Sequence, residues 1–135
     1  MSSLERLIPV LVYRDIAVAH DFLVQAFGFK AGGVERDADG KAVHAEVRVG
    51  GTPVWLHRVT TEHQLGSPET VDMAGAGLVV YVSDVDTHFA NARAAGARIQ
   101  YEPTDQLYGQ REYEARDLEG HRWWFATPLS TSTPS

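Results

Sequence analysis

The stretch "IPVLVYRDIAVAHDFLVQAFG" (Ile8 to Gly28) has a counterpart later in the chain, "GLVVYVSDVDTHFANARAAG" (Gly77 to Gly96). Each begins with an apolar run rich in β-branched residues, which is typical of a strand, and continues into helical spacing. A single offset of 69 positions relates three pairs of landmarks: Asp15 and Asp84, Gly51 and Gly120, and Trp55 and Trp124. One offset shared by three landmarks indicates an internal repeat, which sets the architecture.

Each half of the repeat predicts a βαβββ module. An aspartate stands where each helix would begin, a preferred N-cap, and Gly28 and Gly96 stand where the helices would end. The sequence after each helix predicts three short strands. Glycine-containing turns separate them, such as "DADG" (Asp37 to Gly40) and "DLEG" (Asp117 to Gly120). We therefore expect one compact domain with a first module at 1–61, a polar linker at 62–76, a second module at 77–128 and a disordered tail at 129–135.

The composition excludes several classes of protein. The 135 residues are 44% hydrophobic, enough for a real core, and the formal charge of -6 argues against a nucleic-acid binder. No apolar run approaches a membrane span, and the N-terminus lacks the apolar segment of a signal peptide. The absence of cysteine excludes disulfides, thiolate metal sites and a cysteine nucleophile. We expect a cytoplasmic protein with neither nucleic acid nor membrane as partner.

Six short segments of the sequence carry a family resemblance: "PVLVYRD", "FLVQAFGFK", "DGKAVHAEVRVGG", "VYVSDVD", "AAGARI" and "RDLEGHRWWFATP". In this order the chain resembles the vicinal oxygen chelate superfamily of glyoxalase I, bleomycin-resistance proteins and extradiol dioxygenases, and in particular its PhnB-like branch. The resemblance implies an α+β fold in which two βαβββ modules form a cup-shaped, partly open mixed sheet with helices on the convex face. It also implies a homodimer and a small-molecule ligand in the cup.

The metal enzymes of that family carry one ligand on each of four strands. The resemblance places those positions at Ile8, Trp55, Gly77 and Trp124, none of which can bind a divalent cation. We therefore expect no cofactor, with a divalent metal at another site as the alternative. The two tryptophans replace ligands, so they either line the cup and stack on a ligand or fill the vacated space as core.

Alternation along the strands suggests which side chains face the cup. In "HAEVRV" (His44 to Val49), His44, Glu46 and Arg48 share the polar face, and Trp55 shares a face with His57. His57 and Glu46 are weak candidates for acid–base catalysis, and with His44 they form an alternative metal site. The second module offers the Tyr81 hydroxyl on the corresponding face.

The segment from Tyr101 to Asp117 is rich in tyrosine and charge. In the resembling branch this stretch closes over the cavity. The resemblance therefore implies that four of its residues contact the ligand: Tyr101, Tyr108, Arg111 and Tyr113. The alternative is a solvated hairpin without a binding role.

Three functions remain open from the sequence. We favour a metal-free binding protein for a small molecule, for example an antibiotic or another planar aromatic compound. The alternative is a metal-dependent or acid–base lyase, isomerase or dioxygenase with a non-standard site. The third is an interaction module whose cup is closed.

Overall fold

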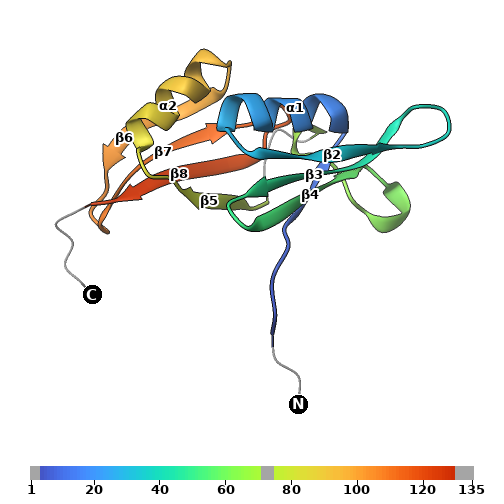
Figure 1. Cartoon of the computed structure of the whole chain (residues 1–135), viewed down its shortest axis with the longest axis horizontal. Helices are drawn as coiled ribbons and strands as arrows, with labels where there is room; N and C mark the ends of the chain where they lie inside the picture. The colour runs from blue at the N-terminus through green and yellow to red at the C-terminus, as the bar shows by residue number, and fades with distance from the viewer. Residues whose placement is uncertain (1–3, 71–74, 130–135) are drawn as a thin grey trace.

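Two modules of the same plan follow one another along the chain (Figure 1). The computed structural model describes residues 4–70 and 75–129. The first module comprises β1 (Val10–Tyr13), α1 (Ile16–Phe27), β2 (Lys30–Arg36), β3 (Ala42–Val49) and β4 (Thr52–Arg58). The second comprises β5 (Gly77–Tyr81), α2 (Val85–Ala94), β6 (Arg98–Asp105), β7 (Gln110–Arg116) and β8 (Arg122–Pro128). The predicted repeat of two βαβββ modules is confirmed.

The segment between the modules contains two short 3₁₀ helices, η1 (Thr61–His63) and η2 (Pro68–Thr70). Part of the predicted linker, residues 71–74, lies outside the described residues. The predicted disordered tail also lies outside them, apart from Leu129. No helix within the described ranges is long and apolar enough to cross a membrane.

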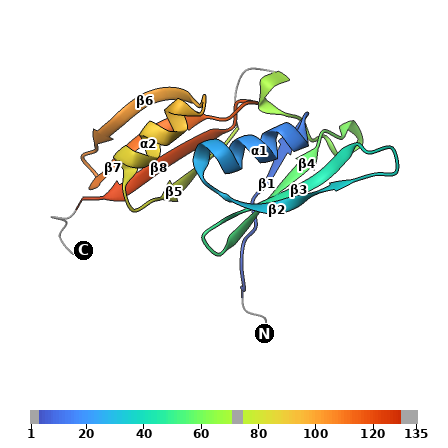
Figure 2. The same ribbon diagram turned by 45° about the horizontal axis from the view of Figure 1, so that its top comes forward.

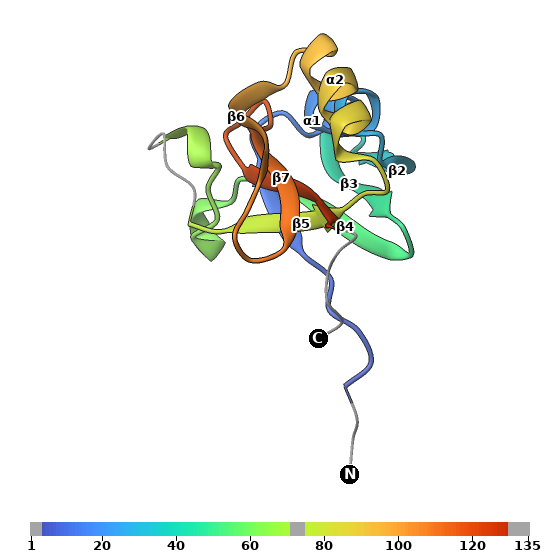
Figure 3. The ribbon, with the colours of Figure 1, turned by 90° about the vertical axis from the view of Figure 1, so that its left-hand side faces the viewer.

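Each module forms its own four-stranded sheet, with strand orders β1-β4-β3-β2 and β5-β8-β7-β6. The first and last strands of each module pair in parallel, and the other neighbours are antiparallel. Helix α1 crosses the first sheet and α2 the second, on the same side of the molecule (Figure 2). Figure 3 shows the segment before β1 leaving on the opposite side. The α+β class is confirmed, but within the described residues the chain forms two separate open sheets, because no strand pair joins them.

The helix ends follow the local sequence. The Asp15 side chain accepts a hydrogen bond from the Val18 N–H at 3.3 Å, and Asp84 accepts one from Thr87 at 3.2 Å. Each aspartate therefore satisfies a donor that the first helical turn leaves free. Gly28 ends α1 with a φ of 78°, a left-handed conformation that costs glycine little because it has no Cβ.

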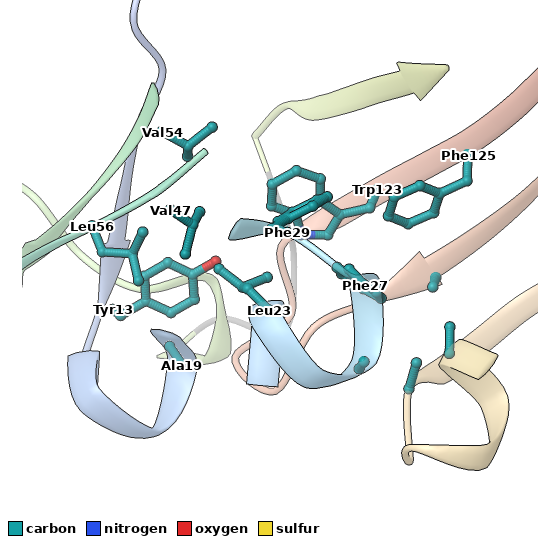
Figure 4. Close-up of a cluster of buried hydrophobic side chains, with 14 of the residues drawn as sticks. Tyr13, Ala19, Leu23, Phe27, Phe29, Val47, Val54, Leu56, Trp123 and Phe125 are labelled. Atoms are coloured by element: carbon teal, nitrogen blue, oxygen red, sulfur yellow. The ribbon is translucent and has the colours of Figure 1, made fainter. Parts of the chain in front are cut away.

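The largest aromatic cluster of the core lies where the two modules meet. Phe27 and Phe29, around the end of α1, point toward Trp123 and Phe125 on β8 (Figure 4). The ring centroids of Phe27 and Phe125 are 4.8 Å apart, and those of Phe29 and Trp123 are 5.2 Å apart. Trp123 is completely buried. These contacts give the modules a shared core.

A β-turn of the second module, Asp117–Gly120, joins the modules through polar contacts; we call it the inter-module turn. Asp117 is buried and accepts hydrogen bonds from the Tyr13 hydroxyl and from the Trp123 indole N–H, the latter at 3.1 Å. Burial and the neighbouring carboxylate raise the pKa of Tyr13 well above its usual value, so its hydroxyl stays protonated and donates.

Glu119, in the same turn, is also buried and binds the first module and the linker at once. Its carboxylate accepts hydrogen bonds from the backbone N–H groups of Arg14 and Asp15 at 2.6 and 2.7 Å, just before α1. It also accepts one from the Ser67 hydroxyl at 2.6 Å. A buried carboxylate is stable only with such donors, so this residue fixes where the first helix begins relative to the second module.

His88 on α2 makes a second polar link. Its Nε2 lies 2.7 Å from the carbonyl oxygen of Phe27, which can only accept, so Nε2 carries the proton. Nδ1 then accepts from the Tyr113 hydroxyl at 2.7 Å. Burial lowers the pKa of His88, which keeps the ring neutral in this arrangement.

We expect Glu119→Ala to lower the free energy of unfolding by roughly 2 to 4 kcal/mol, because three donors lose one charged acceptor. Urea denaturation followed by circular dichroism measures the change. The matched control is Glu102→Ala, which removes an exposed carboxylate that pairs with Arg93 at the surface and should change stability by less than about 0.5 kcal/mol. Equal effects of the two substitutions would contradict the assigned role of Glu119.

Candidate functional site

The face of each sheet that lies away from its helix carries the candidate residues; we call it the open face. In the first sheet Ala45, Val47, Val54 and Leu56 are buried toward α1. Residues that alternate with them, among them Trp55 and His57, lie on the opposite side and are half-buried. The predicted division of these strands into two faces is confirmed, as the pleat requires.

Trp55 is held on the open face of the first sheet by a carboxylate. Its indole N–H donates to Glu46 at 3.0 Å, directly across the β3–β4 pair. Arg48 donates to the other oxygen of Glu46 at 3.1 Å. The His44 ring lies against Trp55 at 5.7 Å in an edge-on arrangement. The tryptophan is therefore fixed at its polar edge while part of its surface stays exposed.

A cavity of about 310 Å³ adjoins Trp55. Its lining comes from β2, β3 and β4 and consists of Gly32, Gly33, Val34, Glu35, His44, Glu46 and Trp55. The β2–β3 register shifts between Ala31 and Val34, so the two glycines form a bulge at the rim. A Cβ on Gly32 would lie 2.7 Å from the backbone oxygen of Glu46, so this close approach requires glycine.

Trp124 occupies the corresponding place in the second sheet. It pairs with Glu114 across β7 and β8, as Trp55 pairs with Glu46. The guanidinium of Arg122 lies 5.0 Å from the Trp124 ring centre and donates to Glu114 at 2.8 and 3.2 Å. Each sheet thus contains one tryptophan, one glutamate and one arginine in contact, a group that we call the Trp–Glu–Arg unit.

Gly77 makes room for the Trp124 ring. A Cβ at this position would lie 2.3 Å from Cζ3 of Trp124, so the ring lies directly over the Gly77 backbone. Both positions correspond by resemblance to metal ligands. In this chain Gly77 leaves a space at its missing Cβ, and the Trp124 ring occupies that space. Gly77 and Arg122 also line a cavity of about 280 Å³ between β1, β5 and the linker.

The tyrosines of the second sheet form a hydrogen-bonded group around a buried carboxylate. The Tyr81 hydroxyl donates to Gln110 at 2.7 Å, and Gln110 donates to Glu112 at 2.8 Å. Tyr101 also donates to Glu112. Burial alone would raise the pKa of Glu112, but these donors hold it below its usual value, so it stays ionised. Tyr108 is exposed at the edge of this group.

Two of the predicted ligand contacts, Tyr113 and Arg111, do not lie on the open face. Tyr113 is fully buried under α2, where its hydroxyl is bonded to His88. Arg111 turns toward Asp86 and Asp105, each at 3.1 Å. Both residues alternate with Glu112 along β7, so the pleat directs them away from the open face. The structure therefore does not bring these two side chains to the open face.

The residues present do not fit a metal ion. The four positions that correspond to the family's ligands are isoleucine, glycine and two tryptophans, and an indole N–H only donates. The two histidines of the alternative metal site contact other groups. The Nδ1 of His44 lies 3.2 Å from the Glu35 carboxylate, and the Nδ1 of His57 lies 2.7 Å from the Arg58 carbonyl oxygen. Among residues 4–70 and 75–129, no three or more histidine, aspartate or glutamate side chains are grouped to hold a metal.

We expect Gly77→Ala to push the Trp124 ring off the sheet, at a cost in stability of roughly 1 to 3 kcal/mol. Acrylamide quenching of tryptophan fluorescence in a Trp55→Phe background measures the exposure of Trp124, since Trp123 is buried. The control is Gly66→Ala, where an added Cβ meets no atom within 4 Å. Unchanged quenching and stability in Gly77→Ala would contradict this packing.

Comparisons with known proteins agree with the fold. A family model for the glyoxalase/bleomycin resistance protein/dioxygenase superfamily matches residues 7–125. An uncharacterized protein of Mycobacterium bovis is 35% identical over 124 residues, which cover 90% of this chain and 82% of that protein.

Two solved structures superpose well. TioX from Micromonospora sp. ML1 has a TM-score of 0.72 at 38% identity, over 93% of this chain and 99% of that one. A glyoxalase/bleomycin resistance protein/dioxygenase from Nocardioides has a TM-score of 0.68 at 19% identity, over 100% of this chain and 90% of that one, and this likeness shows the fold alone.

Proposed function

The chain belongs to the glyoxalase/bleomycin resistance protein/dioxygenase superfamily, and we propose that it is a small-molecule binding protein that holds a planar aromatic ligand without a metal ion. The observation that carries this proposal is the Trp–Glu–Arg unit, which occurs once on the open face of each sheet. A planar antibiotic is one member of this ligand class.

The exposure of the tryptophans supports a binding role over a packing role. Trp123 is the tryptophan that fills the core, whereas Trp55 and Trp124 are only half-buried. An exposed indole face offers a ligand stacking worth about 0.5 to 1.5 kcal/mol beyond its buried area. The carboxylates and arginines already hold the rings in place, so little side-chain entropy is lost when a ligand stacks on them.

The acid–base alternative has less support. Glu46 is engaged by the Trp55 indole and by Arg48, so it is poorly placed to accept a proton from a substrate. His57 is bonded through Nδ1 to the backbone carbonyl of Arg58, and no carboxylate among the described residues is hydrogen-bonded to its ring. A catalytic role for either residue would need a partner group that orients it toward the substrate.

We expect Trp55→Ala and Trp124→Ala each to weaken binding of a planar aromatic ligand by at least about tenfold, because each removes a stacking face. A panel of quinolines, acridines and flavins, screened by calorimetry against the wild-type chain, supplies the probe. Trp55→Phe and Trp124→Phe are the matched controls and should retain most of the affinity. A ligand that binds both alanine variants as well as the wild type, or one that binds only with added metal, would contradict the proposal.

A homodimer is part of the same proposal. β1 and β5 are edge strands, and apolar side chains are exposed near them on Leu7, Val10 and Val79. The two Trp–Glu–Arg units lie on separate sheets and line different cavities within one chain. A second copy that covers these edges would bring the open face of one protomer's first sheet toward its partner's second sheet and enclose the ligand.

We expect the wild-type chain to sediment as a dimer at micromolar concentration, and Val79→Asp to sediment as a monomer, because a charge at the covered edge must be desolvated. Val18→Asp, an exposed valine on α1, is the control and should remain dimeric. Sedimentation velocity distinguishes the species. A wild-type monomer would contradict this part of the proposal.

A further inference from the structure

Two carboxylates on the open faces are paired with arginines within the chain. Glu46 is bonded to Trp55 and Arg48, and Glu114 receives both hydrogen bonds from Arg122. Glu112, by contrast, accepts hydrogen bonds from the neutral side chains of Tyr101 and Gln110 and keeps its charge. Although the whole chain has a formal charge of -6, Glu46 and Glu114, the carboxylates across from the two tryptophans, therefore offer little unbalanced negative charge to a ligand.

Three arginines stand in a row across the second sheet. Arg98 on β6 is directly opposite Arg116 on β7, and Arg116 is directly opposite Arg122 on β8. Like charges at directly opposite positions repel and destabilise a sheet, since their Cβ atoms are only about 5 Å apart. We call these three residues the arginine row.

Only one member of the row has a carboxylate partner among the described residues. Arg122 is paired with Glu114, whereas the side chains of Arg98 and Arg116 make no hydrogen bond or ion pair with the described residues. The Nε of Arg116 is buried and has no acceptor in the part of the chain that the structure describes. A buried donor without a partner costs free energy, and no acceptor within the described residues offsets that cost for this guanidinium.

The row adjoins the proposed aromatic site. Arg122 lies over the Trp124 ring at 5.0 Å. Arg116 is two residues beyond Glu114 on β7, so the pleat directs it to the same open face. Arg98 is exposed at the outer end, which gives a ligand access from solvent.

We propose that the arginine row is an oxyanion subsite and that the ligand is a planar aromatic compound bearing a carboxylate or phosphate group. This inference rests on the proposed function and names its ligand class. The ring stacks on Trp124, and the anionic group accepts hydrogen bonds from Arg116 and Arg98. A guanidinium presents two parallel N–H groups that match either oxyanion. The anion neutralises the unpaired charge of the row.

The first test uses inorganic phosphate alone, at constant ionic strength with chloride as the reference anion. We expect phosphate at tens of millimolar to raise the Tm of the wild type by about 2 to 4 °C, as a weak ligand of the folded state does. Arg116→Gln and Arg98→Gln should each lose at least half of this rise. Arg98 is exposed, so its substitution tests the subsite even if Arg116→Gln folds poorly. Arg93→Gln on α2, an exposed arginine paired with Glu102, is the matched control and should keep the full rise.

The second test compares 2-naphthoate, 2-naphthyl phosphate and neutral 2-naphthamide by calorimetry. We expect the two anions to bind at least about tenfold more tightly than the amide, because a charged group gains charge-assisted hydrogen bonds. Arg116→Gln and Arg98→Gln should remove this preference and leave the amide's affinity unchanged. The tighter of the two anions identifies which oxyanion the row prefers.

The outcomes separate the two proposals. Equal binding of all three naphthalenes, with the same phosphate response in wild type and variants, would overturn the oxyanion subsite and leave the aromatic site intact. A phosphate response that depends on Arg116 and Arg98, with no binding of any naphthalene, would support the subsite and overturn the aromatic site. Failure in both tests would overturn both.

Discussion

The hydrogen bonds of Glu119 and Asp117 connect three parts of the chain that are far apart in sequence. One short turn of the second module accepts hydrogen bonds from the end of β1, from the residues that precede α1 and from the linker. A buried carboxylate that loses its donors costs free energy. These hydrogen bonds therefore fix the positions of the turn, the first helix and the linker relative to one another. The aromatic cluster around Phe27 and Trp123 then fills the space that this arrangement leaves between the modules.

The position of the candidate site depends on that arrangement. Because the two helices are fixed on one side, both sheets leave their other face uncovered, and the alternating residues of β3, β4, β7 and β8 line it. The same pleat puts aromatic core residues under the helices and the Trp–Glu–Arg units on the open faces. A binding surface therefore results from the same strands that stabilise the fold.

The two units hold their tryptophans in different ways. A coordinating carboxylate at Trp55 or Trp124 would be held by a metal ion, whereas an indole needs an acceptor for its N–H or a surface to lie on. Glu46 supplies the acceptor in the first sheet, and Gly77 with Arg122 supplies the surface in the second. The ion pair between the glutamate and the arginine of each unit offsets the free-energy cost of partly burying these charges. In the arginine row of the second sheet, by contrast, two of the three arginines have no such partner among the described residues.

The sequence by itself determined the repeat, the helix caps at Asp15 and Asp84, the strand faces around Trp55, and the lack of ligand-forming side chains at Ile8 and Gly77. Those features depend on residue type and short-range periodicity, which are readable along the chain. The resemblance implied ligand contacts for Arg111 and Tyr113, and only the strand register of β7 shows that both side chains lie on the helix side. Only the tertiary structure decided that Glu119 caps the entry to α1, that Trp123 fills the core while Trp124 lies over Gly77, and that three arginines stand in one row. These contacts join residues on different strands or up to 105 positions apart, and such pairings depend on strand register and module packing, which no local pattern records.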